Sequence, residues 1–181
     1  MYKSIGVIEL KCIPKGVEAA DAALKSAGID MVSAHPSCPG KYEIILSGSI
    51  SNVTAAVSHV TSKFEGYIID SSIMGRIEDQ VIKALFGTNT GEQKGSLGLI
   101  ETYSAASAIR AADIAVKCAR VEIYDLRVSR GMGGKGVVML TGEIGDVSAA
   151  VEAGVNYAKE QGTLSSSAVI PAPHEDLWRQ M

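Results

Sequence analysis

The segment SIGVIE at Ser4–Glu9 returns as SLGLIE at Ser96–Glu101, 92 residues further along the chain. At the same offset, GVEAADAALKSAGID from Gly16 aligns with AIRAADIAVKCARVE from Ala108. Both segments are rich in alanine, and both carry an aspartate followed four residues later by a lysine. Matches at a fixed offset are the mark of an internal repeat. The sequence therefore predicts one folding unit that is present twice.

The later part of the repeat pairs at a slightly larger offset. GKYEIILSG from Gly40 matches GKGVVMLTG from Gly134, so two residues are inserted in the preceding loop, where insertions cost least. SNVTAAV then matches GDVSAAV, and SSIMGRIED matches SAVIPAPHE. We predict two domains, residues 1–90 and 91–181, connected by the Gly- and Thr-rich segment FGTNTGEQKG at 86–95.

Each copy shows the pattern strand, helix, strand, strand, helix, strand. Val17, Ala20 and Leu24 recur at helical spacing, and Asn52 and Asp146 are suitable N-cap residues for the second helix of each copy. The expected strands begin near Ile5 and then cover 29–34, 42–46 and 67–73 in the first copy and 121–128, 137–140 and 163–169 in the second. Two helices on one face of a mainly antiparallel sheet make an α+β fold.

The composition is that of a globular protein, with 46% hydrophobic and 20% charged residues. The net charge of -3 gives no electrostatic reason to expect nucleic acid as a partner. No apolar run approaches the roughly 18 residues that cross a bilayer, and the start MYKSIGVIELKC lacks the unbroken apolar stretch of a signal peptide. We therefore expect a cytoplasmic protein that binds neither nucleic acid nor membrane.

The sequence gives little support for catalysis. The three histidines, His35, His59 and His174, stand in unrelated settings, and no Ser-His-Asp order or metal-binding histidine pair emerges. The segment GMGGKG does not complete a phosphate-binding loop, because Ser129 and Gly136 stand where that motif needs a glycine and a hydroxyl. We expect that the protein is not an enzyme.

The three cysteines, Cys12, Cys38 and Cys118, are too widely spaced for a disulfide framework or for a zinc site built on Cys-x-x-Cys pairs. Cys12, near a strand end, and Cys118, on a helix, are expected to be small buried side chains. Cys38 differs, because it lies in HPSCPGK between Pro36 and Pro39. The prolines favour an extended backbone before them and the following glycine allows a sharp reversal, so the thiol is expected at the tip of a stiff loop.

These features together resemble the shell proteins of bacterial microcompartments. The resemblance rests on the duplicated G-x-I-E segment, the alanine-rich helix with Asp-x-x-x-Lys, the Gly-Lys loop, CPGK at Cys38–Lys41, and the ending VIPAPHEDLW. It spans the full chain. The match is to the tandem-domain type, and most closely to the iron-sulfur shell proteins of propanediol-utilisation compartments.

The resemblance implies an assembly and a cofactor. Members of this group form homotrimers whose six domains imitate a hexamer, and these tile edge to edge with other shell proteins. In the iron-sulfur members, the cysteine matched by Cys38 ligates a 4Fe-4S cluster at the central pore, one cluster per trimer with three such ligands. The implied use is electron transfer across the compartment shell, with cluster delivery to encapsulated redox enzymes as a second use.

The resemblance also assigns a pore loop to each copy. The second loop, SRGMGGKG, has no cysteine, so only alternate domains would present a ligand and the fourth iron would have no matching protein cysteine. The glycines of this loop are expected to let the backbone pass where side chains would collide. The expected pore-loop residues are His35, Pro36, Ser37, Pro39, Gly40 and Lys41 in the first copy and Arg130, Gly131, Met132, Gly133 and Gly134 in the second.

Four further residues are implied to contact the neighbouring tile at the shell edge, namely Lys25, Lys117, Arg76 and His174. Taken alone, the two lysines are the basic halves of helix-surface pairs worth about 0.2 to 0.5 kcal/mol. Trp178, the single tryptophan, is expected to anchor the C-terminal segment by apolar burial.

Two other functions remain open at this point. In the first, Cys38 holds no metal and the pore admits a metabolite. In the second, the duplicated α+β unit is a regulatory sensor that binds a ligand between its halves, since this layer architecture serves many functions. Cys38 would then be an ordinary unpaired thiol.

Overall fold

The computed structural model describes residues 4–88, 94–128 and 131–181. The chain divides into two compact units. The first consists of residues 1–77, 104–106 and 129–134, and the second of residues 78–103, 107–128 and 135–181. The domain boundary predicted between residues 90 and 91 lies outside the described residues.

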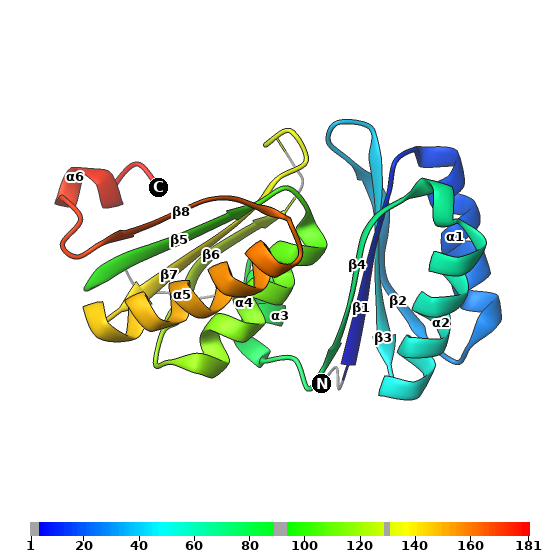
Figure 1. The fold of residues 1–181 in the computed structure, drawn as a ribbon, viewed down its shortest axis with the longest axis horizontal. Helices are drawn as coiled ribbons and strands as arrows, with labels where there is room; N and C mark the ends of the chain where they lie inside the picture. The colour runs from blue at the N-terminus through cyan, green and yellow to red at the C-terminus, as the bar shows by residue number, and fades with distance from the viewer. Residues whose placement is uncertain (1–3, 89–93, 129–130) are drawn as a thin grey trace. The chain divides into compact units, whose positions relative to one another are not determined.

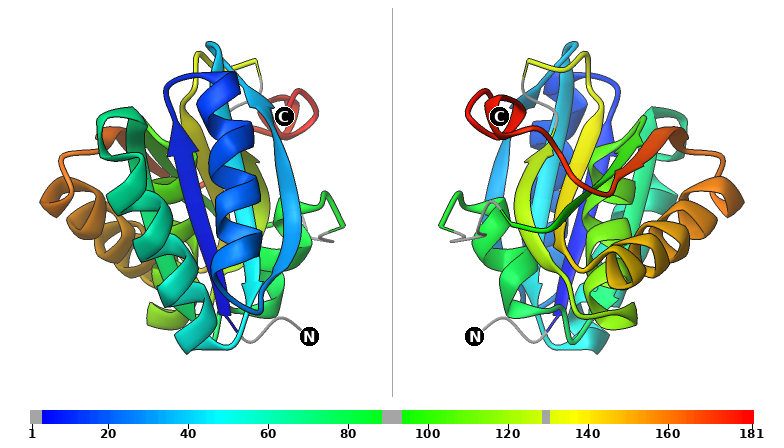
Figure 2. Two further views of the ribbon diagram at one scale, coloured as in Figure 1. Left: turned by 90° about the vertical axis from the view of Figure 1, so that its right-hand side faces the viewer. Right: turned by 90° about the vertical axis from the view of Figure 1, so that its left-hand side faces the viewer.

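The first unit is a four-stranded antiparallel sheet with two helices on one face (Figure 1). Its strand order is β2-β3-β1-β4, so β1 lies between β3 and β4. The left view of Figure 2 shows α1 and α2 side by side on that face. Its elements are β1 Ser4–Leu10, α1 Ile13–Ser26, β2 Asp30–Ser37, β3 Lys41–Gly48, α2 Ile50–Lys63, the 3-10 turn η1 Glu65–Tyr67 and β4 Ile68–Gly75.

The second unit repeats this topology with the strand order β6-β7-β5-β8. All neighbouring strands within it are antiparallel, and the predicted fold class is confirmed. Its elements are α3 Asp79–Leu85, β5 Ser96–Thr102, α4 Ala105–Cys118, β6 Glu122–Val128, β7 Gly136–Gly142, α5 Ile144–Glu160, β8 Leu164–Ile170 and α6 Glu175–Trp178. No helix among the described residues has both the length and the hydropathy to cross a membrane.

The glycine shared by SIGVIE and SLGLIE lets a helix lie directly on the central strand of each sheet. A Cβ atom on Gly6 would stand 2.6 Å from a methyl group of Val57 on α2. A Cβ atom on Gly98 would stand 2.6 Å from a methyl group of Val151 on α5. Both distances are far below van der Waals contact, so only glycine fits at this closest approach.

The alanine-rich helices pack closely against their neighbours. A Cβ atom on Gly16 of α1 would stand 2.2 Å from the Tyr42 side chain on β3, and one on Gly154 of α5 would stand 3.2 Å from the backbone oxygen of Ala111 on α4. Small residues on these helix faces therefore bring each backbone close to its neighbour.

The local predictions differ from the structure at the helix starts. Asn52 and Asp146 are not N-caps, because α2 and α5 each begin three residues earlier after Ser49 and Glu143. The Ser49 hydroxyl accepts the hydrogen bond of the Asn52 backbone N–H, so it is the capping group of α2. The Asn52 side chain instead donates to the Gly28 carbonyl oxygen at 2.8 Å. Helices α3 and α6 were not predicted.

We predict that Gly16→Ala destabilises the first unit by about 1 to 3 kcal/mol, because the added methyl group overlaps the Tyr42 side chain. Urea unfolding followed by circular dichroism measures this change. Gly145→Ala on α5 is the matched control, since its Cβ meets nothing within 4 Å. It is expected to be neutral or stabilising by up to about 1 kcal/mol, and equal losses in both variants would contradict the packing argument.

Candidate functional site around the Cys38 turn

Cys38 lies in the tight turn between β2 and β3, as the sequence predicts. The turn consists of Cys38, Pro39 and Gly40, and the Gly40 N–H donates to the Ser37 carbonyl oxygen at 3.0 Å. Gly40 has a φ of 90°, a left-handed conformation that favours glycine. The Cys38 thiol is free and half-buried, and the Cys38–Pro39 peptide is cis.

The loop around Cys38 is shorter in the structure than the predicted pore loop, residues 35–41. His35, Pro36 and Ser37 are the last residues of β2, and Lys41 is the first residue of β3. Pairing with β3 continues to Ser37 opposite Lys41, so the ladder extends to the base of the turn. Only Cys38, Pro39 and Gly40 therefore project as loop.

The glycine-rich segment of the second copy lies against this turn, within the same compact unit. Gly134 has a φ of 83°, and a Cβ atom there would stand 2.6 Å from the Cys38 carbonyl oxygen and 2.9 Å from Pro39 Cδ. Gly131 and Gly133 also have positive φ angles, and Met132 lies between them. The close approach explains the glycine at position 134, whereas Cβ atoms on Gly131 and Gly133 would meet no atom of the described residues within 4 Å. The predicted residue Arg130 lies outside the described residues.

Lys41 connects the two segments. Its Nζ donates to the Gly134 carbonyl oxygen at 3.1 Å and lies 3.5 Å from Glu9 Oε1 on β1. The Lys41 side chain is 14% exposed, so this cation is largely removed from water. A buried ammonium needs a partner of opposite charge, and Glu9 supplies it.

Glu9 belongs to a row of ionisable residues that crosses the first sheet. The strand register places His35 opposite Glu43, Glu43 opposite Glu9, and Glu9 opposite Asp70. Directly opposed side chains on neighbouring strands lie close enough to interact. Three carboxyl groups therefore gather on one face, with Lys41 beside Glu9 and His35 Nε2 3.8 Å from Glu43 Oε1.

The buried setting changes the acidity of Glu9. Its side chain has no exposed surface, and Oε2 accepts the Ala106 backbone N–H at 3.2 Å. The pKa of Glu9 is raised to about 7, and burial is the largest cause. Lys41 and the Ala106 N–H act in the opposite direction, whereas the neighbouring Glu43 and Asp70 add to the rise. Glu9 therefore titrates near neutral pH.

The repeated residue in the second copy has the opposite shift. Glu101 Oε2 accepts hydrogen bonds from the Ser165 hydroxyl at 2.5 Å and from Lys135 Nζ at 2.9 Å, and its side chain is 32% exposed. The Ser165 hydrogen bond and then Lys135 lower the pKa of Glu101. Its cross-strand neighbour on β7 is Val137, where the first copy has Glu43. Our sequence reasoning missed this contrast, although a glutamate inside the apolar run YEIIL was a signal for it.

The two edge lysines have different surroundings. Lys25 Nζ pairs with Asp21 at 2.6 Å, and both side chains are exposed on α1. Lys117 Nζ pairs with Asp113 at 2.6 Å, but Asp113 is buried and also accepts the backbone N–H of Glu78 at the start of α3. The acid of the second pair therefore positions α3, whereas the first pair lies on the surface.

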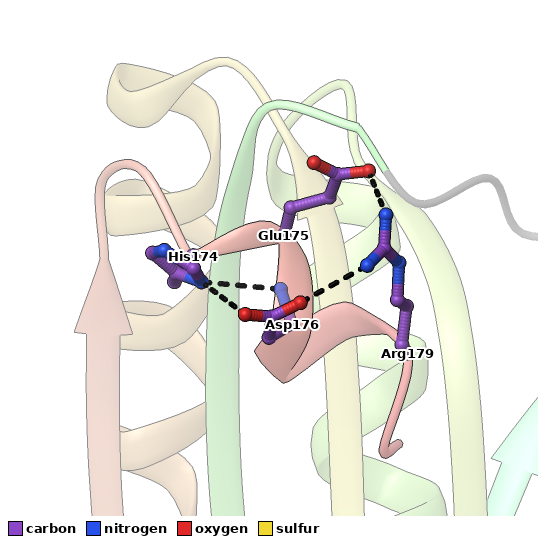
Figure 3. A network of polar contacts seen from close by, with 4 residues as sticks. All are labelled: His174, Glu175, Asp176 and Arg179. Atoms are coloured by element: carbon purple, nitrogen blue, oxygen red, sulfur yellow. Dashed lines mark hydrogen bonds and ion pairs between the residues drawn. The ribbon is translucent and has the colours of Figure 1, made fainter.

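The other two predicted edge residues lie at chain reversals. Arg76 follows β4 with a φ of 51°, a conformation that is uncommon for a side chain other than glycine. His174 is the N-cap of α6, where Nδ1 accepts the Asp176 backbone N–H at 3.2 Å (Figure 3). Arg179 closes this network by donating to the carboxylates of Asp176 and Glu175.

The C-terminal anchor is confirmed, and one cysteine prediction is wrong. Trp178 is buried and meets the Tyr124 ring edge-on, with ring centroids 5.6 Å apart. Cys118 is exposed rather than buried, because it lies in the last turn of α4 facing solvent, and Cys12 is half-buried. Within the described part of the chain, no three His, Cys, Asp or Glu side chains gather where they could hold a metal ion.

A model of the BMC domain matches residues 4–77 and again residues 96–173. The chain therefore belongs to the BMC-domain family. It is 38% identical to the bacterial microcompartment shell protein PduT of Citrobacter freundii, over all of this chain and 98% of that protein. It is also 28% identical to the carboxysome assembly protein CcmO of Synechococcus elongatus, over 96% of this chain and 67% of that protein.

Two solved structures agree with this assignment. A microcompartment protein from Desulfitobacterium hafniense superimposes with a TM-score of 0.85 at 39% identity, covering 99% of both chains. A fused permuted hexameric shell protein, MSM0275, shares the fold with a TM-score of 0.67 at 23% identity, covering 87% of this chain and 84% of its own. The resemblance found in the sequence is confirmed, and the protein is a tandem-domain structural component of a bacterial microcompartment shell.

We predict that Glu9→Gln changes the pH dependence of stability. A raised pKa contributes stability that is present below the unfolded value of about 4.5 and is lost as pH rises through about 7. Glutamine has no such loss, so the free energy of unfolding of the variant relative to wild type should rise by roughly 2 to 3 kcal/mol between pH 5 and pH 8.

Urea unfolding across this pH range measures the difference. Glu101→Gln is the matched control from the second copy and is expected to behave with the opposite sign. Its lowered pKa gives stability above the unfolded value that is lost as pH falls, so this variant should lose most at neutral pH. The same profile in both variants would contradict the assignment.

Proposed function

We propose that three chains close into a ring in which three Cys38 turns hold one 4Fe-4S cluster, and that the cluster carries electrons across the compartment shell. The observation that carries this proposal is the position of Cys38, whose free thiol lies in a three-residue turn braced by the glycine-rich segment. Delivery of the cluster to enclosed enzymes is the second use of the same site.

The exposure of the two copies supports an assembly of several chains. Val17 on α1 is 52% exposed, whereas its repeat equivalent Ile109 on α4 is fully buried. Ile13 on α1 is also exposed, and its equivalent Ala105 is buried. Because the copies are duplicates, we infer that a neighbouring chain covers the α1 surface.

Each sheet also has an outer face, which points away from its own helices. On this face the first copy is more buried than the second, the reverse of the order seen for α1 and α4. In the first sheet, Val7, Glu9 and Ile45 on this face are buried. In the second sheet, the equivalent Leu99, Glu101 and Met139 are only half-buried. The chain therefore offers two different open surfaces, α1 and the outer face of the second sheet.

A contact between two different surfaces repeats from chain to chain and forms a ring where the rotation closes. Two domains per chain give a six-domain ring when three chains close it, as the resemblance implies. The exposed Lys25 pair on α1 is then a candidate contact at the shell edge, together with Arg76 and His174. Lys117 is the weaker candidate, because its acid is already used at the start of α3.

The residues at the turn fit an iron-sulfur cluster. A thiolate is the usual protein ligand of cluster iron, and a threefold axis supplies three copies of Cys38. The adjacent Ser37 hydroxyl is buried and has no hydrogen-bond partner among the described residues. Hydrogen bonds to cluster sulfur are one way in which proteins set the potential, and this hydroxyl is a candidate donor. The bound cluster would supply one-electron chemistry.

We predict that wild-type protein purified without oxygen is brown and contains close to four iron and four sulfide ions per three chains. Cys38→Ser should lose the colour and the iron, because each trimer then lacks all three thiolates. Cys118→Ser is the matched control and should keep both, since Cys118 is an exposed thiol on α4. Iron and sulfide analysis with electron paramagnetic resonance after dithionite reduction measures this outcome. Colourless wild type would favour a metal-free pore for metabolites.

We predict that Val17→Lys prevents ring closure, because it places a charge on an apolar surface that the assembly covers. Sedimentation velocity should show monomers in place of trimers. Glu18→Lys introduces the same side chain one residue along α1, where Glu18 pairs with Lys15 on the surface, and should leave the trimer intact. Trimers in both variants would place the interface elsewhere.

A further inference from the structure

We propose that Lys41 is the positioning residue of the Cys38 turn. Anchored on buried Glu9, it fastens the glycine-rich segment of the second copy against the turn that carries the thiol. The proposal rests on the proposed function in one respect only, which is that Cys38 is the residue whose position matters.

The contacts form a continuous chain within the first compact unit. Lys41 Nζ reaches Glu9 Oε1 at 3.5 Å and the Gly134 carbonyl oxygen at 3.1 Å. Gly134 in turn lies so close to the Cys38 carbonyl oxygen that a Cβ atom would stand 2.6 Å from it. The backbone of the turn is thus held by β2 and β3 at its base and by Gly134 on its side.

The anchor is rigid because it is buried. The Glu9 side chain has no exposed surface, and its second oxygen accepts the Ala106 N–H. Glu43 on β3 and Asp70 on β4 face it across the sheet, His35 lies beside Glu43, and Lys41 is the cation that pairs with Glu9. Above pH 7, where Glu9 is ionised, removing one partner of this buried pair leaves an uncompensated charge, so the pair resists breaking far more than a surface ion pair does.

The second copy shows that this arrangement is specific to the cysteine-bearing copy. Lys135 is the repeat equivalent of Lys41, since both follow the glycine of the Gly-Lys segment. Lys135 pairs with Glu101 at 2.9 Å and lies over the Tyr103 ring, with Nζ 5.7 Å from the ring centroid. The same residue type in the same repeat position thus contacts a loop carbonyl beside Cys38 in one copy and an aromatic ring in the other.

This geometry indicates a role for the glycine-rich segment of the second copy. It carries no cysteine, but it braces the turn that does, and Lys41 holds it there. A ligand turn and a bracing segment would then accompany each other in every chain of the ring.

The test compares Lys41→Met, Lys135→Met and Lys41→Arg in the full-length, metal-free protein. Iodoacetamide alkylation of Cys38 is followed by peptide mass spectrometry from pH 6 to pH 10, with exposed Cys118 in the same molecule as the reference. The limiting rate at high pH reports how accessible the Cys38 thiolate is, and the midpoint of the pH profile reports the pKa of the thiol. A displaced turn therefore changes the limiting rate, whereas the loss of the Lys41 charge alone changes the midpoint.

Lys41→Met should raise the limiting rate of Cys38 relative to Cys118 by about fivefold or more. Lys135→Met should leave this ratio within twofold of wild type. Lys41→Arg keeps the positive charge, so its ratio should lie closer to wild type than to Lys41→Met. A ratio within twofold in Lys41→Met, or the same rise in Lys135→Met, would overturn the proposal.

A second variant keeps the test decisive if Lys41→Met does not fold. Gly134→Ala keeps both residues of the Lys41–Glu9 pair but adds a methyl group 2.6 Å from the Cys38 carbonyl oxygen and 2.9 Å from Lys41 Cε. The methyl group displaces the glycine-rich segment from the turn, so this variant should give the same rise. An unchanged ratio in this variant would also overturn the proposal. Because the protein is metal-free, these rates do not depend on whether a cluster binds, which the Cys38→Ser comparison decides separately.

Discussion

In each half of the protein, a glycine of the central strand lies directly beneath the valines of a helix. Gly6 under Val57 and Gly98 under Val151 set the distance between helix and sheet. The alanine-rich first helix must then fit against the second helix at the same height above the sheet. The repeated G-x-I-E segment is therefore the geometric origin of the layer structure.

Duplication then let the two copies diverge where that layer structure does not constrain them. The outer face of each sheet carries a glutamate at the same position, yet Glu9 is buried with a raised pKa and Glu101 is half-exposed with a lowered one. The difference comes from what lies opposite and beside each residue. Glu9 faces two further acids, whereas Glu101 faces Val137 and accepts a hydroxyl hydrogen bond from Ser165.

The sequence predicted the features that follow from periodicity and repetition, namely the elements and their order. It did not predict the features that depend on strand register and burial, such as the environment of Glu9. The repeat predicted both sheets, and the prolines and the glycine around Cys38 predicted the turn there. The predicted helix starts were wrong because the N-cap positions, Ser49 and Glu143, lie three residues ahead of Asn52 and Asp146. Only Ser49 makes a side-chain capping hydrogen bond. The Lys41 link to Gly134 was not predictable, since it joins residues 93 positions apart and depends on the three-dimensional course of both segments.

Under the proposed function, the difference between the two copies sets the number of cysteine ligands in the ring. A ring of six identical domains would bring six thiols to one axis, whereas a cubane cluster has only four irons to ligate. Placing the cysteine in one copy gives three ligands, and replacing it in the other with glycines leaves room for backbone to lie against the ligand turn. The bracing segment and the ligand turn are then two outcomes of one ancestral loop.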